Sequence, residues 1–255
     1  MDIKYVMADP TGNITALVET LVPTENQPEI AEAILEKEPT CEQVGYILWP
    51  MDGSDISLRM AGGEFCGNAT MSTAAYFCKK HDLKDGEKKT VKVKVVGTSG
   101  VLAVDVENKG GVFYTTIEMP KPLKISDVKF TFEGHNYIYP VVEFDSISHA
   151  IIENDLPVYM PEACIKMWCD SLRAKGLGLM MLYNNNTSLR PLVYVTTPET
   201  MFWESSCASG TTAVGVYFAK KTGKPVKMEL NEPGGKLVVE TFSDGMVKLS
   251  GKVVI

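Results

Sequence analysis

The chain carries one stretch of sequence twice, as EFCGNATMSTAAYFCKK at residues 64–80 and as SSCASGTTAVGVYFAKK at residues 205–221. When Cys66 is set on Cys207, a threonine four residues further on and the later Tyr-Phe and Lys-Lys pairs coincide as well. Each copy opens with a cysteine among Gly, Asn or Ser residues, which are typical of turns, and continues with a helical pattern. The repeat therefore predicts two equivalent helices, each beginning at a cysteine.

Small residues mark the stripe of each predicted helix that recurs at i, i+3, i+4 and i+7. The stripe positions are Met71, Ala74, Ala75 and Cys78 in the first copy and Thr212, Gly215, Val216 and Ala219 in the second. Small side chains allow a helix to approach its neighbours closely. We therefore expect both helices to be core helices, each packed against a surrounding sheet.

The repeat continues past the helices as paired strands. GVLAVDVENKGGVFYTTI, from Gly100, lies on GKLVVETFSDGMVKLSGK, from Gly235, with the turns NKGG and SDGM coinciding. β-rich segments dominate the rest of the chain, and further helical patterns occur at about 28–37 and 160–175. These patterns predict an α+β fold of two pseudo-symmetric domains, each a β-sheet or barrel around a central helix.

The prolines in Met119-Pro120-Lys121-Pro122 interrupt the pattern and place a boundary there. We therefore expect an N-terminal domain at residues 1–118 and a C-terminal domain at residues 119–255. The final strand is a candidate to cross back to the first domain. Two similar domains are expected to meet about a pseudo-two-fold axis, with both cysteines facing one cleft.

Composition narrows the class of partner. The 255 residues include 25 basic and 32 acidic side chains, for a net charge of −7, without a basic cluster that would suit nucleic acid or an anionic membrane. The amino terminus lacks the pattern of a secretion signal, and no stretch approaches the roughly 20 apolar residues that span a bilayer. The sequence predicts a cytoplasmic protein with a small-molecule partner and neither nucleic acid nor membrane as a partner.

The six cysteines have to be explained one by one. Without a secretion signal they are not expected to form a disulfide framework, and three histidines with no C-x-x-C pair argue against a zinc site or any other metal. Four of the six, Cys41, Cys78, Cys164 and Cys169, are interpreted as buried packing residues. The other two, Cys66 and Cys207, occupy equivalent places in the repeat and are therefore candidates for chemistry.

A cysteine at a helix amino terminus meets unpaired N–H groups and the positive end of the helix dipole, so we expect its thiol pKa to be lowered. The same N–H groups can hold a carboxylate. Two such termini facing each other could hold an amino acid with one sulfur on each face of its α-carbon. One sulfur would remove the α-proton and the other would return a proton to the opposite face, which predicts inversion without a cofactor.

These motifs resemble a known superfamily. FCGNATMS resembles the first cysteine turn of the diaminopimelate epimerases, SSCASGTTAVG resembles the second, and PTGN at residues 10–13 is similar to their amino-terminal signature. CEQVGYI, WESSCASGT and EPGGKLVV resemble the histidine racemase branch more closely. The resemblance covers essentially the whole chain. It implies a diaminopimelate epimerase-like fold, a cofactor-independent amino-acid racemase and a homodimer.

The resemblance also implies the site. Cys66 and Cys207 would be the acid/base pair, Asn68, Ala208 and Ser209 would contact the α-carboxylate, and Asn13 would orient the substrate. The substrate-binding candidates are Asn13, Glu42, Gly67, Asn68, His149, Asn184, Glu204, Ala208 and Ser209. Three of these have bland alternatives: Glu42 as a solvated strand-edge carboxylate, Asn184 as part of a turn, and His149 as a hydrogen-bonded structural histidine.

The sequence departs from the diaminopimelate epimerases where they bind a second carboxylate. They carry an arginine shortly before the second cysteine, whereas PETMFWESS contains none, and the chain's arginines are Arg59, Arg173 and Arg190. A substrate with a distal carboxylate is therefore disfavoured. Acidic residues near the motifs, such as Glu42 and Glu204, suit a side chain that donates hydrogen bonds, and histidine is the predicted substrate.

Other readings remain open at the level of sequence. The protein could racemise another amino acid, with diaminopimelate disfavoured. GNAT and the preceding GEF also resemble phenazine-biosynthesis isomerases, which share the fold but lack the cysteine pair. A non-catalytic amino-acid-binding protein with inert thiols is a third alternative.

Overall fold

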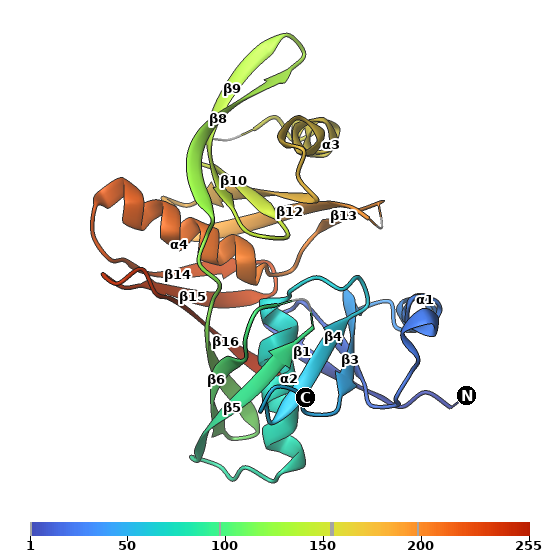
Figure 1. Cartoon of the computed structure of the whole chain (residues 1–255). Helices are drawn as coiled ribbons and strands as arrows, with labels where there is room; N and C mark the ends of the chain where they lie inside the picture. Colours follow the sequence, from blue (N-terminus) through green and yellow to red (C-terminus); the bar gives the residue numbers. More distant parts are fainter. Residues whose placement is uncertain (1, 97, 154–155, 198) are drawn as a thin grey trace. The chain divides into compact units, whose positions relative to one another are not determined.

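A computed structural model describes residues 2–96, 98–153, 156–197 and 199–255 (Figure 1). The chain divides into two compact units. The first contains Met1–Glu118 and Ser250–Ile255, and the second contains Met119–Leu249. The division at residue 118 lies just before Pro120 and Pro122, and the last six residues belong to the first unit.

The first unit is a barrel of strands around one helix. Its elements are β1 (Tyr5–Pro10), β2 (Thr15–Val18), the 3-10 turn η1 (Thr24–Asn26), α1 (Gln27–Lys37), β3 (Gln43–Leu48), β4 (Ile56–Met60), α2 (Gly67–Lys80), β5 (Lys88–Val95), β6 (Leu102–Lys109) and β7 (Val112–Glu118). The strands follow one another from β1 to β7, and the end of β16 (Val247–Val254) lies next to β7. β16 also pairs antiparallel with β1, where Asp9 lies opposite Val254, so the eight strands form a closed ring.

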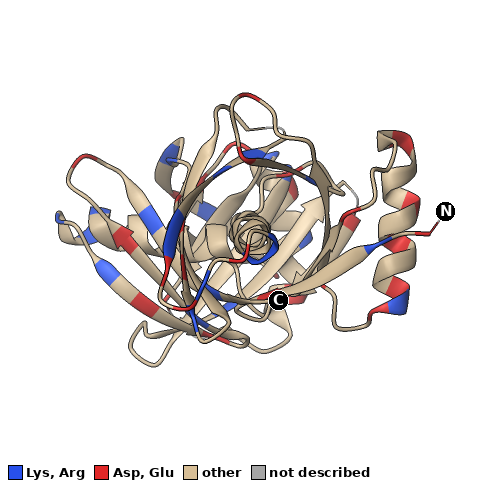
Figure 2. Ribbon diagram, turned by 90° about the horizontal axis from the view of Figure 1, so that it is seen from below, with Lys and Arg blue, Asp and Glu red and all other residues tan. Residues whose placement is uncertain are grey.

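α2 runs through the middle of this ring, as the view along its axis in Figure 2 shows. The helix contacts β1, β2, β4, β5, β6 and β7, and every residue from Gly67 to Tyr76 is buried. A helix buried on all sides has no need of a polar face. The predicted stripe from Met71 to Cys78 is therefore buried, and so are the other residues in the first turns of the helix.

The second unit repeats this order of elements. Its elements are β8 (Lys124–Phe132), β9 (His135–Glu143), β10 (Ser148–Ile152), α3 (Met160–Leu172), β11 (Gly176–Tyr183), β12 (Ser188–Thr196), β13 (Glu199–Trp203), α4 (Ala208–Thr222), β14 (Lys227–Glu232), β15 (Gly235–Thr241) and the start of β16. The strand order is β8-β9-β10-β11-β12-β14-β15-β16, with β13 paired to the edge of β12. α4 packs on β9, β10, β11, β14 and β15.

Strand directions show the duplication independently of residue identity. β2 and β3 are parallel in the first unit, as are β10 and β11 in the second. β4 and β5 are parallel, as are β12 and β14. Parallel neighbours need a long crossover connection, and here each crossover contains a helix. α1 links β2 to β3 and α2 links β4 to β5, while α3 links β10 to β11 and α4 links β12 to β14. The two halves therefore share one topology, to which β8 and β13 are additions.

Close helix packing explains the small residues of the repeat. A Cβ placed on Gly215 of α4 would lie 2.5 Å from Cγ2 of Val239 in β15, which is closer than real contacts allow. On the outer side of the second sheet, α3 buries Trp168, whose ring stacks on Phe130 at 4.7 Å. The second unit thus has apolar layers on both faces of its sheet.

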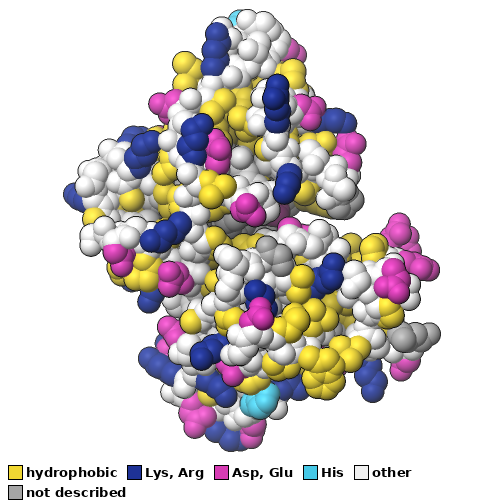
Figure 3. Space-filling model, in the orientation of Figure 1, with side chains coloured by type: hydrophobic (Ala, Val, Ile, Leu, Met, Phe, Trp, Pro, Cys, Tyr) yellow, Lys and Arg dark blue, Asp and Glu magenta, His cyan; other side chains and the backbone are white. Residues whose placement is uncertain are grey.

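On the face shown in Figure 3, Lys and Arg side chains are interspersed with Asp and Glu and do not gather by sign. Among the described residues, no helix has both the length and the apolar character needed to cross a membrane.

Candidate active site

Cys66 and Cys207 occupy the same structural position. Each is the N-cap residue of its helix, α2 or α4, with φ and ψ of −127° and 116° at Cys66 and −128° and 103° at Cys207. In each case the sulfur accepts a hydrogen bond at 3.4 Å from the backbone N–H three residues later, Ala69 or Gly210. The sequence repeat is therefore also a repeat of backbone conformation, sulfur position and hydrogen bond.

The thiol of Cys66 belongs to a network of neutral amides. Cys66 Sγ donates to Oε1 of Gln43 at 3.2 Å. Nε2 of Gln43 donates to Oδ1 of Asn13 at 2.6 Å and to Oγ1 of Thr15 at 2.8 Å. Nδ2 of Asn13 donates to Oε2 of Glu42 at 2.6 Å. A line of hydrogen bonds therefore runs from Glu42 through two amides to the thiol.

Glu42 is half-buried and bonded to Asn13, so it is not the solvated strand-edge carboxylate considered above. Asn13 is buried, and its amide is fixed between Glu42 and Gln43. Both residues lie within the network that reaches Cys66, which is the part of the first unit where the sequence placed them.

Cys207 lies in a buried, acidic environment. The side chain of Glu204 hydrogen-bonds to the Cys207 thiol. Oε2 of Glu232 accepts the Cys207 backbone N–H at 2.8 Å. Burial is the largest cause that raises the pKa of the Cys207 thiol well above its usual value, and the charges of Glu204 and Glu232 raise it further. The expectation of a lowered thiol pKa is therefore wrong for Cys207, because burial and two carboxylates outweigh the Gly210 N–H that lowers the pKa.

His149 reaches Cys207 through Ser209. Its Nε2 lies 2.9 Å from Oγ of Ser209, and that oxygen lies 3.7 Å from Cys207 Sγ. His149 is fully buried, and burial lowers its pKa to about 3, so the imidazole is neutral at neutral pH. Among the described residues Nδ1 has no hydrogen-bond partner. We assign the proton to Nε2, because a buried N–H without an acceptor is rare, which leaves the Ser209 hydroxyl able to donate to the sulfur.

Glycine at position 178 makes room for this histidine. Gly178 of β11 lies opposite His149 of β10, and a Cβ on Gly178 would lie 2.3 Å from Nδ1. The histidine is thus both a buried, hydrogen-bonded residue and a neighbour of the candidate catalytic thiol.

The remaining predicted residues separate into two groups. Gly67, Asn68 and Ala208 are buried in the first turns of α2 and α4, directly after the cysteines. Asn184 is exposed in the turn between β11 and β12, where it donates to Ser188 Oγ at 3.0 Å. It stands six residues beyond Gly178 along β11, or about 20 Å of extended chain, so the structure supports its alternative as a turn residue. Its positive φ of 51° is typical of asparagine in turns.

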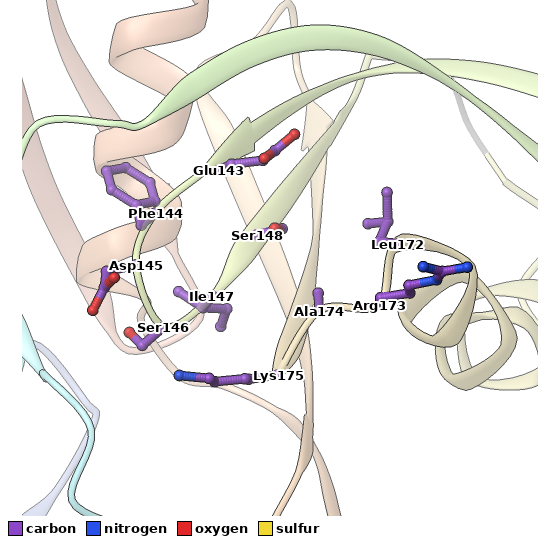
Figure 4. A pocket seen from close by; sticks show the side chains of 10 residues that line it. All are labelled: Glu143, Phe144, Asp145, Ser146, Ile147, Ser148, Leu172, Arg173, Ala174 and Lys175. Carbon is purple, nitrogen blue, oxygen red and sulfur yellow. The ribbon is translucent and has the colours of Figure 1, made fainter.

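A pocket of about 240 Å³ opens elsewhere in the second unit, between the β9–β10 loop and the end of α3 (Figure 4). Its lining includes Glu143 and Asp145 on one side and Arg173 and Lys175 on the other. None of the residues predicted for the site lines it. Phe144, which does, packs edge-on against His149.

Sequence reasoning missed three residues of the site: Gln43, Glu232 and Thr211. Gln43 follows Glu42 in the quoted motif CEQVGYI and was a visible polar candidate. Glu232 is 25 residues from Cys207, and only the fold brings them together. In the repeat alignment Glu232 falls on Gly97, which has no side chain, so comparing the two halves could not reveal it. Groups of three or more metal-ligating side chains do not occur among the described residues.

Known structures share this fold. A "Predicted Epimerase" from Pseudomonas aeruginosa matches with a TM-score of 0.70 at 13% identity, covering 99% of this chain and 96% of that one. A "probable proline racemase" from Agrobacterium radiobacter matches with a TM-score of 0.69 at 11% identity, covering 99% and 90%. A phenazine biosynthesis protein of the PhzF family from Enterococcus faecalis matches with a TM-score of 0.63 at 17% identity, covering 99% and 96%. The fold is thus the one shared by these isomerase-like proteins.

A family match to nearly the whole chain, together with the chain's full-length relatives, makes the protein an isomerase of the amino-acid racemase class. The model of the histidine racemase CntK N-terminal domain matches residues 2–255. A histidine racemase of Fusobacterium nucleatum is 32% identical over 274 residues, covering 99% of this chain and 97% of its own, and one from Staphylococcus aureus is 29% identical over 249 residues, covering 93% and 88%. The chain belongs to the histidine racemase family.

Proposed function

We propose that this protein interconverts L- and D-histidine without a cofactor, by a two-base proton transfer between Cys66 and Cys207. The observation that carries the proposal is the equivalent N-cap position of the two thiols, each at the start of a helix whose first turns are buried. We also propose that the fold is of the diaminopimelate epimerase-like class. Histidine is the proposed substrate because full-length relatives of this chain are named histidine racemases.

In one direction of the reaction Cys207 starts as the acid, because its raised pKa keeps the thiol protonated. Cys66, as thiolate, takes the α-proton: the Cα–H bond breaks and an S–H bond forms. Cys207 then gives its proton to the opposite face of the α-carbon, so its S–H bond breaks and a new Cα–H bond forms with inverted configuration. In the reverse direction the two residues exchange roles.

The helix termini are suited to the charge of the substrate. N–H groups in the first turns of α2 and α4 point away from the helix body, and a carboxylate or an enolate-like intermediate is stabilised there. Gly67, Asn68, Ala208 and Ser209 are the residues of those first turns, and we propose that they hold the α-carboxylate. Water excluded from the buried surroundings of Cys207 would strengthen these interactions.

We propose that Glu42 or Glu204 accepts the imidazole N–H of histidine. A carboxylate has several lone pairs, so the bond from Asn13 leaves Glu42 able to accept a second donor. The chain's arginines have other partners: Arg59 bonds Thr24, Arg190 stacks over Trp203, and Arg173 caps α3 and lines the pocket of Figure 4. Without an arginine beside the thiols, a second carboxylate on the substrate would lack a partner.

The testing experiment is exchange of the α-proton in deuterated water, followed by chiral chromatography. L-histidine should incorporate deuterium at Cα while D-histidine accumulates to an equal amount. An amino-acid-binding protein would give neither exchange nor inversion. A phenazine-type isomerase would leave the α-centre of histidine unchanged, so either outcome would remove the racemase assignment.

The family resemblance also leads us to propose a cytoplasmic homodimer that acts on a free amino acid. Light scattering of the purified protein, at concentrations from below to above those of the assay, would measure the assembly. A monomer at all concentrations with full activity would contradict this part of the proposal.

A further inference from the structure

Glu232 lies in strand β14 and reaches the start of helix α4. It is the last residue of β14, and the residue is only 7% exposed. Its Oε2 accepts the backbone N–H of Cys207 at 2.8 Å, and its Oε1 accepts the hydroxyl of Thr211. Both oxygens of one buried carboxyl group are therefore used at the start of α4, one on the reactive cysteine itself and one four residues later.

This contact replaces a local cap that α4 cannot make. The N–H of an N-cap residue is commonly bound by a Glu or Gln side chain at position N3 of the same helix. N3 of α4 is Gly210, and a Cβ there would lie 2.1 Å from Sδ of Met180. Glycine has no side chain to make this bond, and Met180 occupies the space at N3, so the N–H of Cys207 is satisfied from β14 instead. The carboxyl group that satisfies it is buried beside the thiol.

We propose that Glu232 is a positioning residue that fixes the first turn of α4 and controls, through its own protonation, how readily Cys207 becomes a thiolate. This inference rests on the proposed role of Cys207 and adds a residue to it. An ionised Glu232 places a negative charge beside the sulfur and opposes the thiolate, whereas a protonated Glu232 does not. Cys207 must pass through the thiolate once in every turnover, after giving up its proton.

The groups around Glu232 make this control effective near neutral pH. Burial raises the pKa of Glu232 to about 8, and the charge of Glu204 adds to that rise, while the bonds from Thr211 and from the Cys207 N–H lower it. Glu232 and Cys207 are thus two buried acidic groups in contact, with the partly buried Glu204 beside them, so the protonation of Glu232 and that of Cys207 are coupled. The thiolate of Cys207 is favoured when Glu232 holds a proton.

The test measures thiolate formation at Cys207 directly, so that it does not depend on racemase activity. Full-length protein carrying Cys66→Ser is treated with iodoacetamide, which alkylates thiolates, over a range of pH, and alkylation of Cys207 is followed by peptide mapping. Glu232→Gln keeps the shape but cannot ionise: its amide oxygen can accept the Cys207 N–H, and its amide nitrogen can donate to the hydroxyl of Thr211. The midpoint for Cys207 alkylation should move to lower pH by about one unit, the size of shift that a nearby charge produces.

Two further variants distinguish control of Cys207 ionisation by Glu232 from a purely structural role of Glu232. Thr211→Val removes the hydroxyl that stabilises the ionised Glu232 and should move the midpoint in the same direction by a smaller amount. Glu153→Gln changes another part-buried carboxylate, which bonds Tyr217 and Lys221 near the other end of α4, and should leave the midpoint unchanged.

An unchanged Cys207 midpoint in Glu232→Gln, or an equal shift in Glu153→Gln, would overturn the inference. If Glu232→Gln does not fold, the Thr211→Val result decides in the same way. In the otherwise unaltered enzyme, Glu232→Gln should also weaken the alkaline fall in kcat near pH 8 while leaving KM for histidine nearly unchanged. Shifted alkylation without any racemase activity would support the control of Cys207 and reject the proposed function alone.

Discussion

The amide of Gln43 can turn only one way toward Cys66. Its Nε2 is held by two acceptors, Oδ1 of Asn13 and Oγ1 of Thr15, so Oε1 is the end that meets the sulfur, at 3.2 Å. The acceptor of the thiol hydrogen bond is thus fixed by residues of β2 and the turn before it. This arrangement gives the thiol of the first unit a neutral partner, whereas the thiol of the second unit has carboxylates.

Replacing Gln43 by Met should therefore impair catalysis without removing the thiol. The variant keeps the length of the side chain but deletes the acceptor of the Cys66 bond and leaves two buried polar groups without their donor. We expect kcat/KM for histidine to fall by about 1–3 kcal/mol of transition-state stabilisation. Thr15→Val, which removes only one end of the amide network, is the matched control and should cost less. Equal losses in the two variants would show that the contact with the thiol is unimportant.

Serine in place of either Cys66 or Cys207 should nearly abolish racemisation. A hydroxyl is far less acidic than a thiol and cannot serve in either proton transfer. Initial rates from L- and from D-histidine, measured by chiral chromatography, check both directions. Retention of more than about a tenth of the wild-type rate, which corresponds to a barrier change of roughly 1.4 kcal/mol, would be incompatible with a two-cysteine mechanism. Cys78→Ser, which changes a buried cysteine of α2 outside the proposed acid/base pair, is the control for the loss of any thiol.

Mild oxidation should join Cys66 to Cys207 and silence the enzyme. The two-base scheme requires both sulfurs to reach one α-carbon, so they should come within reach of a disulfide when no substrate separates them. A thiol oxidant such as diamide should inactivate the protein, and dithiothreitol should restore it. Peptide mapping of the oxidised protein is the measurement. Inactive protein in which both residues are still thiols would contradict the scheme.

Glu42→Gln should lower the preference for histidine. The substitution keeps the acceptor for Asn13 but removes the charge that would hold the imidazole N–H. We expect kcat/KM for histidine to fall by about 1–3 kcal/mol, the range for a hydrogen bond to a charged group, and expect a smaller effect on amino acids without a ring N–H. Diaminopimelate and glutamate should not be turned over by the wild type. An unchanged histidine rate, or efficient racemisation of diaminopimelate, would refute the substrate assignment.

Stability should depend on pH through two buried groups that act in opposite directions. The pKa of His149 is lowered from 6.5 to about 3, so the unfolded state binds more protons over that range and stability is lost as pH falls through it. The pKa of Glu232 is raised from 4.5 to about 8, so the folded state binds more protons and stability is lost as pH rises between those values. Each slope is up to about 1.4 kcal/mol per pH unit.

The two contributions oppose each other between pH 4.5 and 6.5. In that range the unfolded state binds the extra proton at His149, whereas the folded state binds the extra proton at Glu232. Urea unfolding across that range should therefore show a weak pH dependence in the wild type. His149→Asn should expose the Glu232 slope, with stability falling as pH rises, and Glu232→Gln should expose the opposite one. Parallel curves for all three proteins would contradict the burial of either group in its neutral form.

Local patterns in the sequence were sufficient for the repeated core. The helices after Cys66 and Cys207 and the hairpins after them depend on short-range periodicity, and the structure confirms all four. Five strands were not anticipated: β1, β4, β8, β10 and β13. β10 (Ser148–Ile152) is buried on both faces and therefore lacks the alternation that marks a strand. β1 (Tyr5–Pro10) also lacks a clean alternation of buried and exposed residues.

The chemistry of the site was harder to predict, because it depends on residues distant in sequence. A helix terminus alone suggests a lowered thiol pKa, but Glu232 reaches Cys207 from 25 residues away and burial acts in the same direction, so the pKa of that thiol is raised. Gln43 likewise meets Cys66 only because β3 lies beside the start of α2. Such partners follow from strand pairing, which a single sequence does not reveal.

The path of β16 sets an order for biosynthesis. The barrel of the first unit closes through the end of β16, where Val253 and Val254 pair with β1 at the opposite end of the chain. During translation the ribosome releases β1 to β7 long before that closing strand, at about 5–20 residues per second. The nascent first unit must therefore wait, with open barrel edges at β1 and β7, until the second unit has been synthesised. An open strand edge of this kind can pair with other chains. The nascent protein should therefore need chaperones most between the synthesis of β7 and the synthesis of the end of β16.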